Sequence, residues 1–468
     1  QLGRAPTVLV GRDPRESGSV LVDAVLDGVQ SSGGKAGDLG VLPTAAVSCA
    51  VFAQAADAGV MVTASHNPAA DNGIKVLGTG GRKLTSNEAS ALESWFDRPA
   101  AKPGGSRTIV AQPLASWQAW LPDLDLSGII LLVDAAHGAG FESAPAALEA
   151  RGATVVRRGC SPDGQNINDQ VGALHPPSAE MVRAAGAQLG ICLDGDADRV
   201  ALVCPEQGLL DGDDLLWLMR DQVEGPVVGT VMSNGGLEAA LAGRLIRSPV
   251  GDAHVAAAMR TAGAHIGAEP SGHVLFSDGM PTGDGLYAAL RVLAAAVGRD
   301  GRPSLPLAAA GWKRWPVHKT NIRFTGSRLE LNSLASIAAA KAAGNRLVVR
   351  YSGTEPKLKY YLDRPLALRR VAAELLRDLA RRAVEVLGDA LLRVERRLRS
   401  RRVVARVELD VELAEGDLAA HAQARLERLG ALELVVELVG QRRARLVVLR
   451  EGVERRLVEE PVLHPLRR

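Results

Sequence analysis

The sequence predicts a multidomain α/β protein in which helices cover largely parallel sheets. Short apolar runs alternate with Ala- and Leu-rich segments of helical spacing, as expected for strands and helices that follow one another. The same alternation restarts near residues 129 and 227, which indicates repeated α/β units. The chain has 468 residues. A length of that order allows about three to five domains.

The elements follow in order along the chain. The first unit opens with an expected buried strand at 7–10, a helix at 17–31 and a second buried strand at 59–64. The next unit has an apolar strand at 129–133 and a helix at 144–150. Further strands are expected at 154–156, 189–193, 227–232 and 265–268. Strands that alternate with helices in this way favour parallel pairing.

The C-terminal part has a different composition. Stretches rich in Gly, Pro or polar residues at 101–106, 207–213 and 300–306 mark expected domain boundaries before it. Residues 389–468 contain 17 Arg and no Lys. An alternating run at 406–413, helical spacing at 417–429 and apolar runs at 432–439 and 444–449 predict a β-α-β-β appendage. Its basic cluster RRLRSRR (396–402) fits a solvated helix end better than an anion site.

Bulk properties exclude several classes of protein. The net charge of +2 gives no support to a nucleic-acid or membrane-surface partner. No apolar run reaches the ~18 residues that a membrane span needs. Four widely spaced cysteines without a CxxC pair favour reduced thiols: Cys49, Cys160, Cys192 and Cys204. We therefore expect a cytoplasmic protein with no nucleic-acid or membrane partner.

The strongest chemical signal is LDGDADR at 193–199. Asp194, Asp196 and Asp198 alternate directly after a buried strand, and alternate residues of an extended segment face one side. Three carboxylates so placed would repel one another without a cation, and ligation by oxygen alone suits Mg²⁺. A metal-free acidic turn is the less favoured alternative. An EF-hand does not fit, because the Glu that ends its loop is missing.

A second signal is MVTASHNP at 61–68, in which Ser65 follows a buried strand. Sites of α/β proteins lie beyond the carboxyl ends of strands. Pro68 keeps Asn67 out of the helical region, so we expect an extended loop around the serine. A Mg²⁺ on the three aspartates could bind and polarise a phosphate on Ser65. A Ser65–His66 dyad and a helix-capping serine are less favoured alternatives.

Two further segments have the composition of ligand clamps. An acid, a hydroxyl and an imidazole suited to a polyhydroxylated ligand alternate in GAEPSGH (267–273): Glu269, Ser271 and His273. A guanidinium, two hydroxyls and glycine-flanked backbone suited to an anion occur in RYSGTEP (350–356): Arg350, Ser352, Gly353 and Thr354. Taken singly, each is explained equally well as a turn with capping residues.

Together, TASHNP, DGDADR, GAEPSGH and RYSGTEP resemble the motifs of the alpha-D-phosphohexomutase superfamily. The resemblance runs from about residue 8 to about residue 388 and includes GRDPRESG (11–18), DNGIK (71–75) and TGDG (282–285). Within the superfamily the chain is most similar to the bacterial phosphoglucosamine mutases. The stretches that carry this likeness are PDGQNIND (162–169), VMSNGGLE (231–238), VGD (250–252) and GAEPSGH (267–273).

The resemblance implies three similar α/β domains with mixed or parallel sheets and a smaller α+β fourth domain around a central cleft. The expected domains are 1–110 with the phosphoserine loop, 111–208 with the Mg²⁺ loop, 209–312 with the sugar loop and 313–388 with the phosphate loop. Residues 389–468 lie outside the family pattern. Relatives usually carry a strand and loop ahead of the GRD motif, so we expect an N-terminal segment to be missing here.

The resemblance also implies site roles. Ser65 corresponds to the phosphorylated serine, and Asp194, Asp196 and Asp198 correspond to the Mg²⁺ ligands, with a phosphate oxygen on Ser65 as a further ligand. Lys75 and Arg199 correspond to basic residues near the transferred phosphate, and either Lys75 or His273 is the general base. Glu269, Ser271 and His273 correspond to the sugar-binding loop. Arg350, Ser352, Gly353 and Thr354 correspond to the loop that holds the non-reacting phosphate.

The implied reaction interconverts glucosamine 6-phosphate and glucosamine 1-phosphate. It passes through a phosphoserine and a hexose 1,6-bisphosphate, which is both intermediate and activator. Lys357 and Lys359 make the fourth motif similar to that of some phosphomannomutases, so mannose and glucose phosphates stay open as substrates. A sugar-phosphate-binding protein without turnover is the alternative from another class. Either a monomer or a homodimer is expected.

Overall fold

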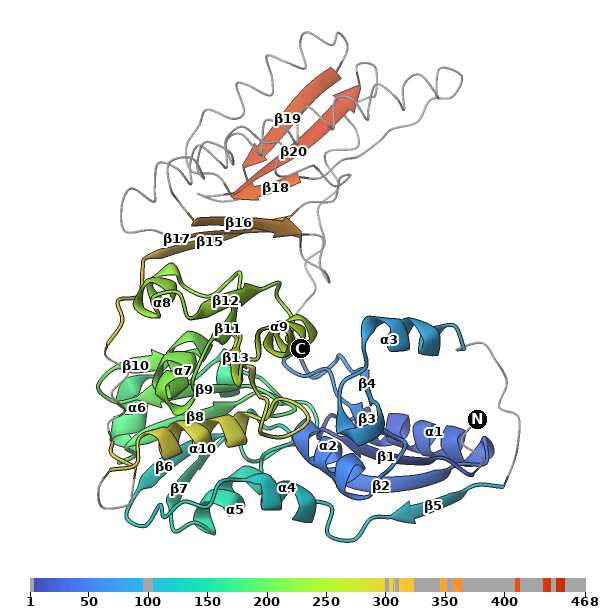
Figure 1. The fold of residues 1–468 in the computed structure, drawn as a ribbon. Coiled ribbons are helices and arrows are strands. Elements are labelled where there is room, and N and C mark those ends of the chain that lie inside the picture. Colours follow the sequence, from blue (N-terminus) through green and yellow to red (C-terminus); the bar gives the residue numbers. More distant parts are fainter. Residues whose placement is uncertain are drawn as a thin grey trace. The chain divides into compact units, whose positions relative to one another are not determined.

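The structure is a computed structural model. It describes residues 4–95, 104–298, 303–305, 307, 311–323, 346–351, 357–363, 409–412, 432–438 and 443–450. The chain divides into two compact units, Gln1–Arg314 and Trp315–Arg468. The first unit contains three sheets that follow one another along the chain, coloured from blue to yellow-green in Figure 1. We call the parts built on them domains I, II and III.

Domain I is built on a five-stranded sheet of order β4-β3-β1-β2-β5. Its strands are β1 (Thr7–Arg12), β2 (Lys35–Val41), β3 (Ala58–Val62), β4 (Ile74–Leu77) and β5 (Ser106–Ile109). All neighbours are parallel except β3 and β4. Helix α1 (Gly18–Ser31) buries Val22 and Leu26 against Val10 and Val60 on one face. The almost wholly buried α2 (Thr44–Ala53) belongs to the core on the other face, and α3 (Ser86–Glu93) follows β4.

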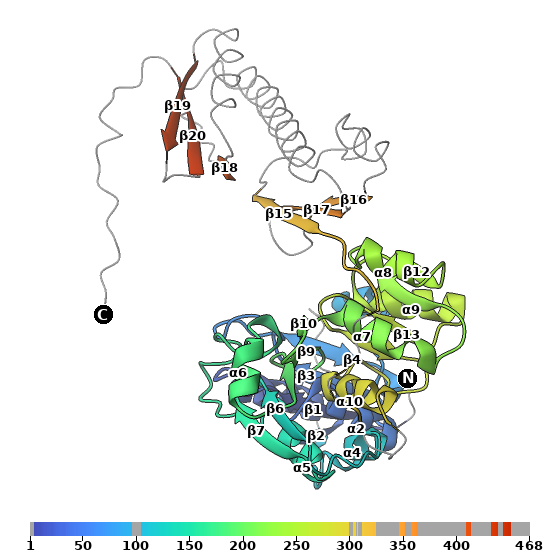
Figure 2. The same ribbon diagram turned by 90° about the vertical axis from the view of Figure 1, so that its left-hand side faces the viewer.

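Domain II repeats this plan in a sheet of order β10-β9-β8-β6-β7. Its strands are β6 (Ile130–Asp134), β7 (Thr154–Arg158), β8 (Leu189–Leu193), β9 (Val200–Cys204) and β10 (Gly208–Leu210). β6 is parallel to β7 and β8, whereas β9 is antiparallel to β8 and β10. Helix α6 (Ala179–Ala184) lies beside this sheet (Figure 2). Its Val182 packs against Cys192 and Ala201 on one face. Helix α5 (Ser143–Glu149) lies against β7 and supplies residues to the core, whereas α4 (Ala115–Trp120) packs against α2 of domain I.

Domain III has a four-stranded sheet of order β12-β11-β13-β14. Its strands are β11 (Val227–Thr230), β12 (Leu245–Ser248), β13 (Ile266–Ala268) and β14 (Val274–Phe276), and only β14 is antiparallel to its neighbour. Its helices are α7 (Gly212–Met219), α8 (Gly235–Ala240) and α9 (Asp252–Ala262), and the following α10 (Gly285–Ala295) packs against α7 and against β8 and β9 of domain II. The strand expected at 227–232 ends at Thr230, because the Ser233 N–H turns back to the Thr230 carbonyl.

One topology therefore occurs three times. In each domain three parallel strands are followed by an antiparallel strand: β4 after β3, β9 after β8, and β14 after β13. The loop at this reversal carries Ser65 in domain I, the aspartate trio in domain II and Glu269–His273 in domain III. The expectation of three similar α/β domains with mixed sheets is confirmed.

One apolar core runs through all three domains. It includes Leu9 of β1, Leu131 of β6, Ile266 of β13 and most of α10. Trp117 of α4 is buried in it, and its indole Nε1 donates a hydrogen bond to Asp284 Oδ2. The domains are therefore packed together rather than joined only by linkers.

The second unit contains two small antiparallel sheets. One has the order β15-β17-β16, with β15 (Val317–Arg323), β16 (Arg346–Tyr351) and β17 (Lys357–Asp363). The other has the order β18-β20-β19, with β18 (Leu409–Glu412), β19 (Leu432–Leu438) and β20 (Arg443–Arg450). These three strands lie where the appendage was predicted to have strands, and the helix predicted at 417–429 lies outside the described residues. None of the described helices has the length and apolar character that a membrane span requires.

Candidate active site

The Ser65 hydroxyl lies in the loop from β3 to β4 and points at domain II. Its Oγ donates a 2.8 Å hydrogen bond to Asp194 Oδ2. It makes this bond to the aspartate rather than to His66, so the Ser65–His66 dyad has no support. Ser65 has a φ of 50°, so the expected extended loop is wrong at this residue. Pro68 restricts Asn67, but it does not constrain the residue two positions earlier.

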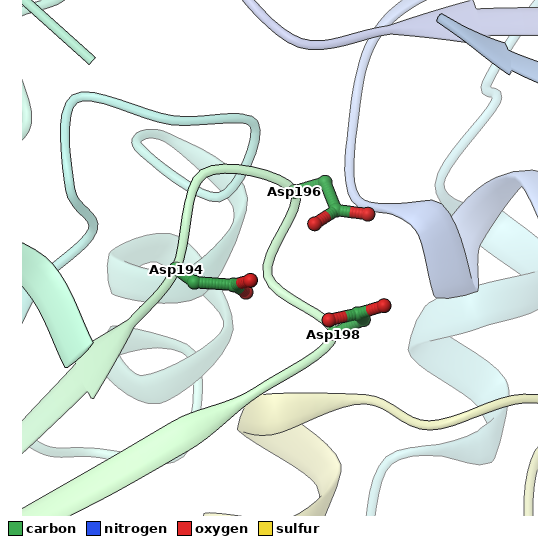
Figure 3. Close-up of side chains that lie close together, drawn as sticks. All are labelled: Asp194, Asp196 and Asp198. Atoms are coloured by element: carbon green, nitrogen blue, oxygen red, sulfur yellow. The ribbon is translucent and has the colours of Figure 1, made fainter. Parts of the chain in front are cut away.

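The three aspartates converge in the loop from β8 to β9. Figure 3 shows their carboxylates facing a common space, and ligand oxygens of all three lie within 4.8 Å of one another. The prediction that the three carboxylates meet is correct. The extended conformation from which it was derived is wrong. Strand β8 ends at Leu193, and a turn closed by the Ala197 N–H on the Asp194 carbonyl folds the loop, with a φ of 59° at Ala197.

The trio has the chemistry of a cation site. Burial, with the charges of Asp198 and Asp196, raises the pKa of Asp194 to about 7. Oδ1 of Asp196 and Oδ1 of Asp198 are buried and have no hydrogen-bond partner among the described residues. Three buried carboxylates with unpartnered oxygens fit a hard divalent cation such as Mg²⁺.

Three basic side chains surround the trio. Lys75 Nζ lies 2.7 Å from Asp196 Oδ2 and 3.3 Å from Asp198 Oδ2. Arg199 Nε lies 3.7 Å from Asp198 Oδ1 and 3.9 Å from Asp194 Oδ2. Both residues were predicted. The third, Lys83, was not: its Nζ lies 3.7 Å from Asp198 Oδ2 and also pairs with Asp252 of domain III.

His273 and its neighbours form the hairpin turn between β13 and β14, where the Glu269 N–H donates to the His273 carbonyl. The buried imidazole has Nδ1 3.6 Å from Asp198 Oδ1 and Nε2 3.8 Å from Asp252 Oδ2. Glu269 Oε1 accepts from the Gly251 N–H at 2.9 Å, and Ser271 is exposed. Because the segment is a tight turn, the expected alternation along a strand end is wrong.

The phosphate-loop residues are only partly described. Arg350 lies in β16, where its backbone is opposite that of Lys359 in the antiparallel strand β17. Ser352, Gly353 and Thr354 lie outside the described residues.

Several further residues contact the site, and no sequence pattern around them predicts this contact. Thr44, which begins α2, donates through Oγ1 to Asp196 Oδ2, and its N–H donates to the Asp196 carbonyl. Asn168 of domain II donates through Nδ2 to the Ser65 carbonyl at 2.9 Å. Arg15, inside the GRDPRESG stretch, donates to the same carbonyl at 3.1 Å. Each acts on a residue that is distant in sequence.

Comparison with known proteins agrees with this arrangement. Family models described as phosphoglucomutase/phosphomannomutase alpha/beta/alpha domains I, II and III match residues 1–102, 121–208 and 211–315. The phosphoglucosamine mutase of Anaeromyxobacter dehalogenans is 39% identical over 411 residues, which cover 79% of this chain and 89% of the relative. That of Cereibacter sphaeroides is 37% identical over 417 residues, covering 82% and 90%.

Solved structures agree on the fold. A phosphoglucomutase/phosphomannomutase family protein from Burkholderia thailandensis superposes with a TM-score of 0.66 at 24% identity, covering 80% of this chain and 89% of the other. This structural likeness shows the fold alone, whereas the three domain matches and the two curated relatives show the family. The chain belongs to the phosphoglucomutase/phosphomannomutase family, within the alpha-D-phosphohexomutase superfamily that its four motifs resemble.

Proposed function

We propose that this protein is a phosphoglucosamine mutase, an isomerase that interconverts glucosamine 6-phosphate and glucosamine 1-phosphate by phosphoryl transfer. The observation that carries the proposal is the Ser65 hydroxyl on the buried aspartate trio, 2.8 Å from Asp194. Curated phosphoglucosamine mutases at 37–39% identity span about four fifths of the chain and support the sugar. Mannose and glucose phosphates are the second candidates.

Phospho-Ser65 is the proposed donor. The sugar hydroxyl forms a bond to phosphorus while the bond from phosphorus to Ser65 Oγ breaks, and the hydroxyl proton passes to a base. The bisphosphorylated sugar then turns over in the site and returns its other phosphoryl group to Ser65. Such transfers depend mainly on in-line positioning and charge neutralisation.

Charge neutralisation is the proposed task of the basic residues. Lys75 and Arg199 already face the trio, so they would also face a phosphate on Ser65. When bound by Asp194, Asp196, Asp198 and a phosphoserine oxygen, Mg²⁺ would supply further neutralisation. A hexose 1,6-bisphosphate is the proposed activator, because it can prime an unphosphorylated Ser65.

The proton acceptor is proposed from geometry. Lys75 Nζ is engaged by two ligand carboxylates, which suits an electrostatic role. His273 Nε2 is buried without a hydrogen-bond partner among the described residues, which leaves it free for a substrate hydroxyl. We therefore favour His273 over Lys75 as the base. Glu269, Ser271, Arg350, Ser352, Gly353 and Thr354 remain the proposed substrate contacts.

The proposed location is the cytoplasm, where free thiols persist. Cys49, Cys160, Cys192 and Cys204 are all free. The substrate is proposed to be a hexosamine monophosphate. A monomer and a homodimer both remain open.

Two measurements test the proposal. Intact-mass spectrometry of protein treated with glucosamine 1,6-bisphosphate should show one added phosphoryl group, which is absent from Ser65→Ala. A coupled assay should then give turnover with glucosamine phosphate that exceeds turnover with mannose and glucose phosphates. Preference for mannose or glucose phosphate would instead support the second candidate function, a mutase acting on those sugars. Binding of sugar phosphate without any turnover would support the non-catalytic alternative.

A further inference from the structure

The backbone of Ser65 adopts a conformation that is unfavourable for a serine. Its φ of 50° lies in the left-handed region, which L-residues other than Asn, Asp and Gly rarely occupy. In this conformation its Oγ faces Asp194 across the domain boundary. Left-handed non-glycine residues persist only where their surroundings over-determine them.

A closed ring of hydrogen bonds surrounds this residue. The Ser65 N–H donates to Thr63 Oγ1 at 2.8 Å, and Thr63 Oγ1 donates to Asp13 Oδ2 at 2.7 Å. Arg15 Nε donates to the same oxygen at 2.9 Å, and Arg15 Nη2 donates to the Ser65 carbonyl at 3.1 Å. The ring thus binds both backbone polar groups of Ser65 and closes at Asp13. The side chains of Asp13 and Arg15 are fully buried.

Arg15 fixes the rest of the loop as well. Its remaining donors bind the carbonyls of Asn67 at 2.9 Å, Asp71 at 2.9 Å, and Pro68. One buried guanidinium therefore gathers four carbonyls of the 65–71 segment. A rigid fork of donors suits this task, whereas a lysine could not match its geometry.

Domain II binds the same carbonyl from the other side. Asn168 Nδ2 donates to the Ser65 carbonyl at 2.9 Å and to the Asn67 carbonyl at 3.0 Å. The backbone of Gly195 lies so close that a Cβ built there would be 2.3 Å from the Ser65 oxygen. The serine loop and the aspartate loop are thus held in direct backbone contact.

We propose that Asp13, Thr63, Arg15 and Asn168 are positioning residues that hold Ser65 in its left-handed conformation, with Oγ aimed at the aspartate trio. The inference rests on the proposed function, because it gives the ring a role in phosphoryl transfer. A serine loop free to relax would lose the alignment that in-line transfer needs. Removing part of the ring should therefore slow the chemical step more than it weakens substrate binding.

Thr63→Val is the most specific test, because it removes one hydroxyl from a buried side chain and keeps its shape. We expect kcat with glucosamine phosphate to fall about 10- to 100-fold while KM changes about twofold or less. Thr63→Ser, which restores the hydroxyl, should recover most of kcat. The matched control is Thr230→Val in domain III, where a fully buried threonine accepts the Met232 N–H at 3.1 Å and takes no part in the ring around Ser65. It should leave kcat unchanged.

Hydrogen exchange gives a readout that does not depend on activity. In Thr63→Val the Ser65 amide should exchange about tenfold faster or more, because its acceptor is gone. The amides of Val60 and Val62 in β3 should keep their protection. If the wild-type protein shows this protected Ser65 amide but turns over no sugar phosphate, the proposed function fails while the ring stands.

The positioning role is overturned if Thr63→Val leaves kcat at the wild-type level, whether or not Ser65 exchange rises. It is also overturned if Thr63→Ser fails to restore activity. Should Thr63→Val not fold, Asn168→Gly provides the second variant. It removes the donors from domain II and tolerates the φ of 61° at that position. It must lower kcat for the proposal to hold.

Discussion

The Ser65 hydroxyl of domain I and Oδ2 of Asp194 in domain II are 2.8 Å apart, although 129 positions separate the two residues in sequence. Both residues follow the third parallel strand of their own domain, at the point where the chain reverses into an antiparallel strand. The site is therefore made by packing equivalent loops of a repeated fold against each other. His273, in the equivalent loop of domain III, approaches the same trio at Asp198.

The first prediction concerns the metal. Asp196→Asn removes one buried charge from the trio and should weaken Mg²⁺ binding about tenfold or more, as measured by calorimetry. Wild-type protein should also gain about 2.7 kcal/mol of unfolding free energy at about a hundredfold excess of Mg²⁺ over Kd. The matched control is Asp169→Asn, an exposed aspartate of the same domain. If both variants bind Mg²⁺ as the wild type does, the trio is not the ligand set.

The second prediction concerns Lys83, which faces Asp198 from domain I and pairs with Asp252 of domain III. Lys83→Met removes one of three cations around the phosphoryl site, so we expect kcat/KM to fall about tenfold. The free energy of unfolding should change by less than about 1 kcal/mol, because Lys83 and Asp252 are both partly exposed. Steady-state kinetics and urea denaturation measure the two effects.

The neighbouring residue supplies the control for Lys83. Arg82 makes an exposed ion pair with Glu88, away from the trio. Arg82→Met should therefore keep wild-type kinetics. Equal losses in the two variants would show that loss of positive charge in this segment matters, rather than the contact with Asp198.

The third prediction concerns Gly195, whose backbone lies against the Ser65 carbonyl. A methyl group there would be 2.3 Å from that oxygen, so Gly195→Ala must push the serine loop and the aspartate loop apart. We expect a loss of about 1–3 kcal/mol of stability and of nearly all turnover. Denaturation curves and the coupled assay measure both.

Gly28 in α1 is the matched glycine. A Cβ at this position meets nothing within 4 Å. Gly28→Ala should therefore be neutral or raise stability by up to about 1 kcal/mol, because alanine favours the helix. If Gly195→Ala behaves like Gly28→Ala, the close approach of the two loops is not required.

The sequence could predict the chemistry-bearing side chains because each lies in a short local motif directly after a recognisable strand. Ser65 and the aspartates follow this rule. Their two motifs, and then the resemblance to a known family, predict that they meet, as the hydrogen bond from Ser65 to Asp194 shows. The sequence could not predict the conformation that aims them. The left-handed φ of Ser65 depends on Arg15 and Asn168, which are 50 and 103 positions away. Lys83 escaped detection for the same reason, since only the packing of domain I against domains II and III brings it to Asp198 and Asp252.

The last prediction concerns an acidic cluster at the start of α7. Burial and the charge of Asp211 raise the pKa of Asp213 to about 7 and that of Asp214 to about 6. Arg314 opposes this through 2.8 Å contacts to both oxygens of Asp211 and a 2.7 Å contact to Asp214. Folded pKa values above the ordinary value mean that the folded state binds protons more tightly than the unfolded state. The stability that these groups contribute is therefore greatest at low pH and is lost as pH rises through their folded pKa values.

Arg314→Met should steepen this loss, because the remaining carboxylates then repel one another without a counter-charge. At about pH 5 Asp213 and Asp214 are largely protonated, so the variant should lose mainly the packing of its side chain and its contacts with Asp211, a loss that is common to both pH values. At about pH 8 we expect an additional loss of about 1 kcal/mol, the equivalent of roughly one further pKa unit. Urea denaturation at the two pH values measures the difference, and Arg157→Met, which breaks an exposed pair with Glu149, should show none. An Arg314→Met loss that is equal at both pH values would mean that the arginine acts only through its packing and its contacts with Asp211, and not on Asp213 and Asp214.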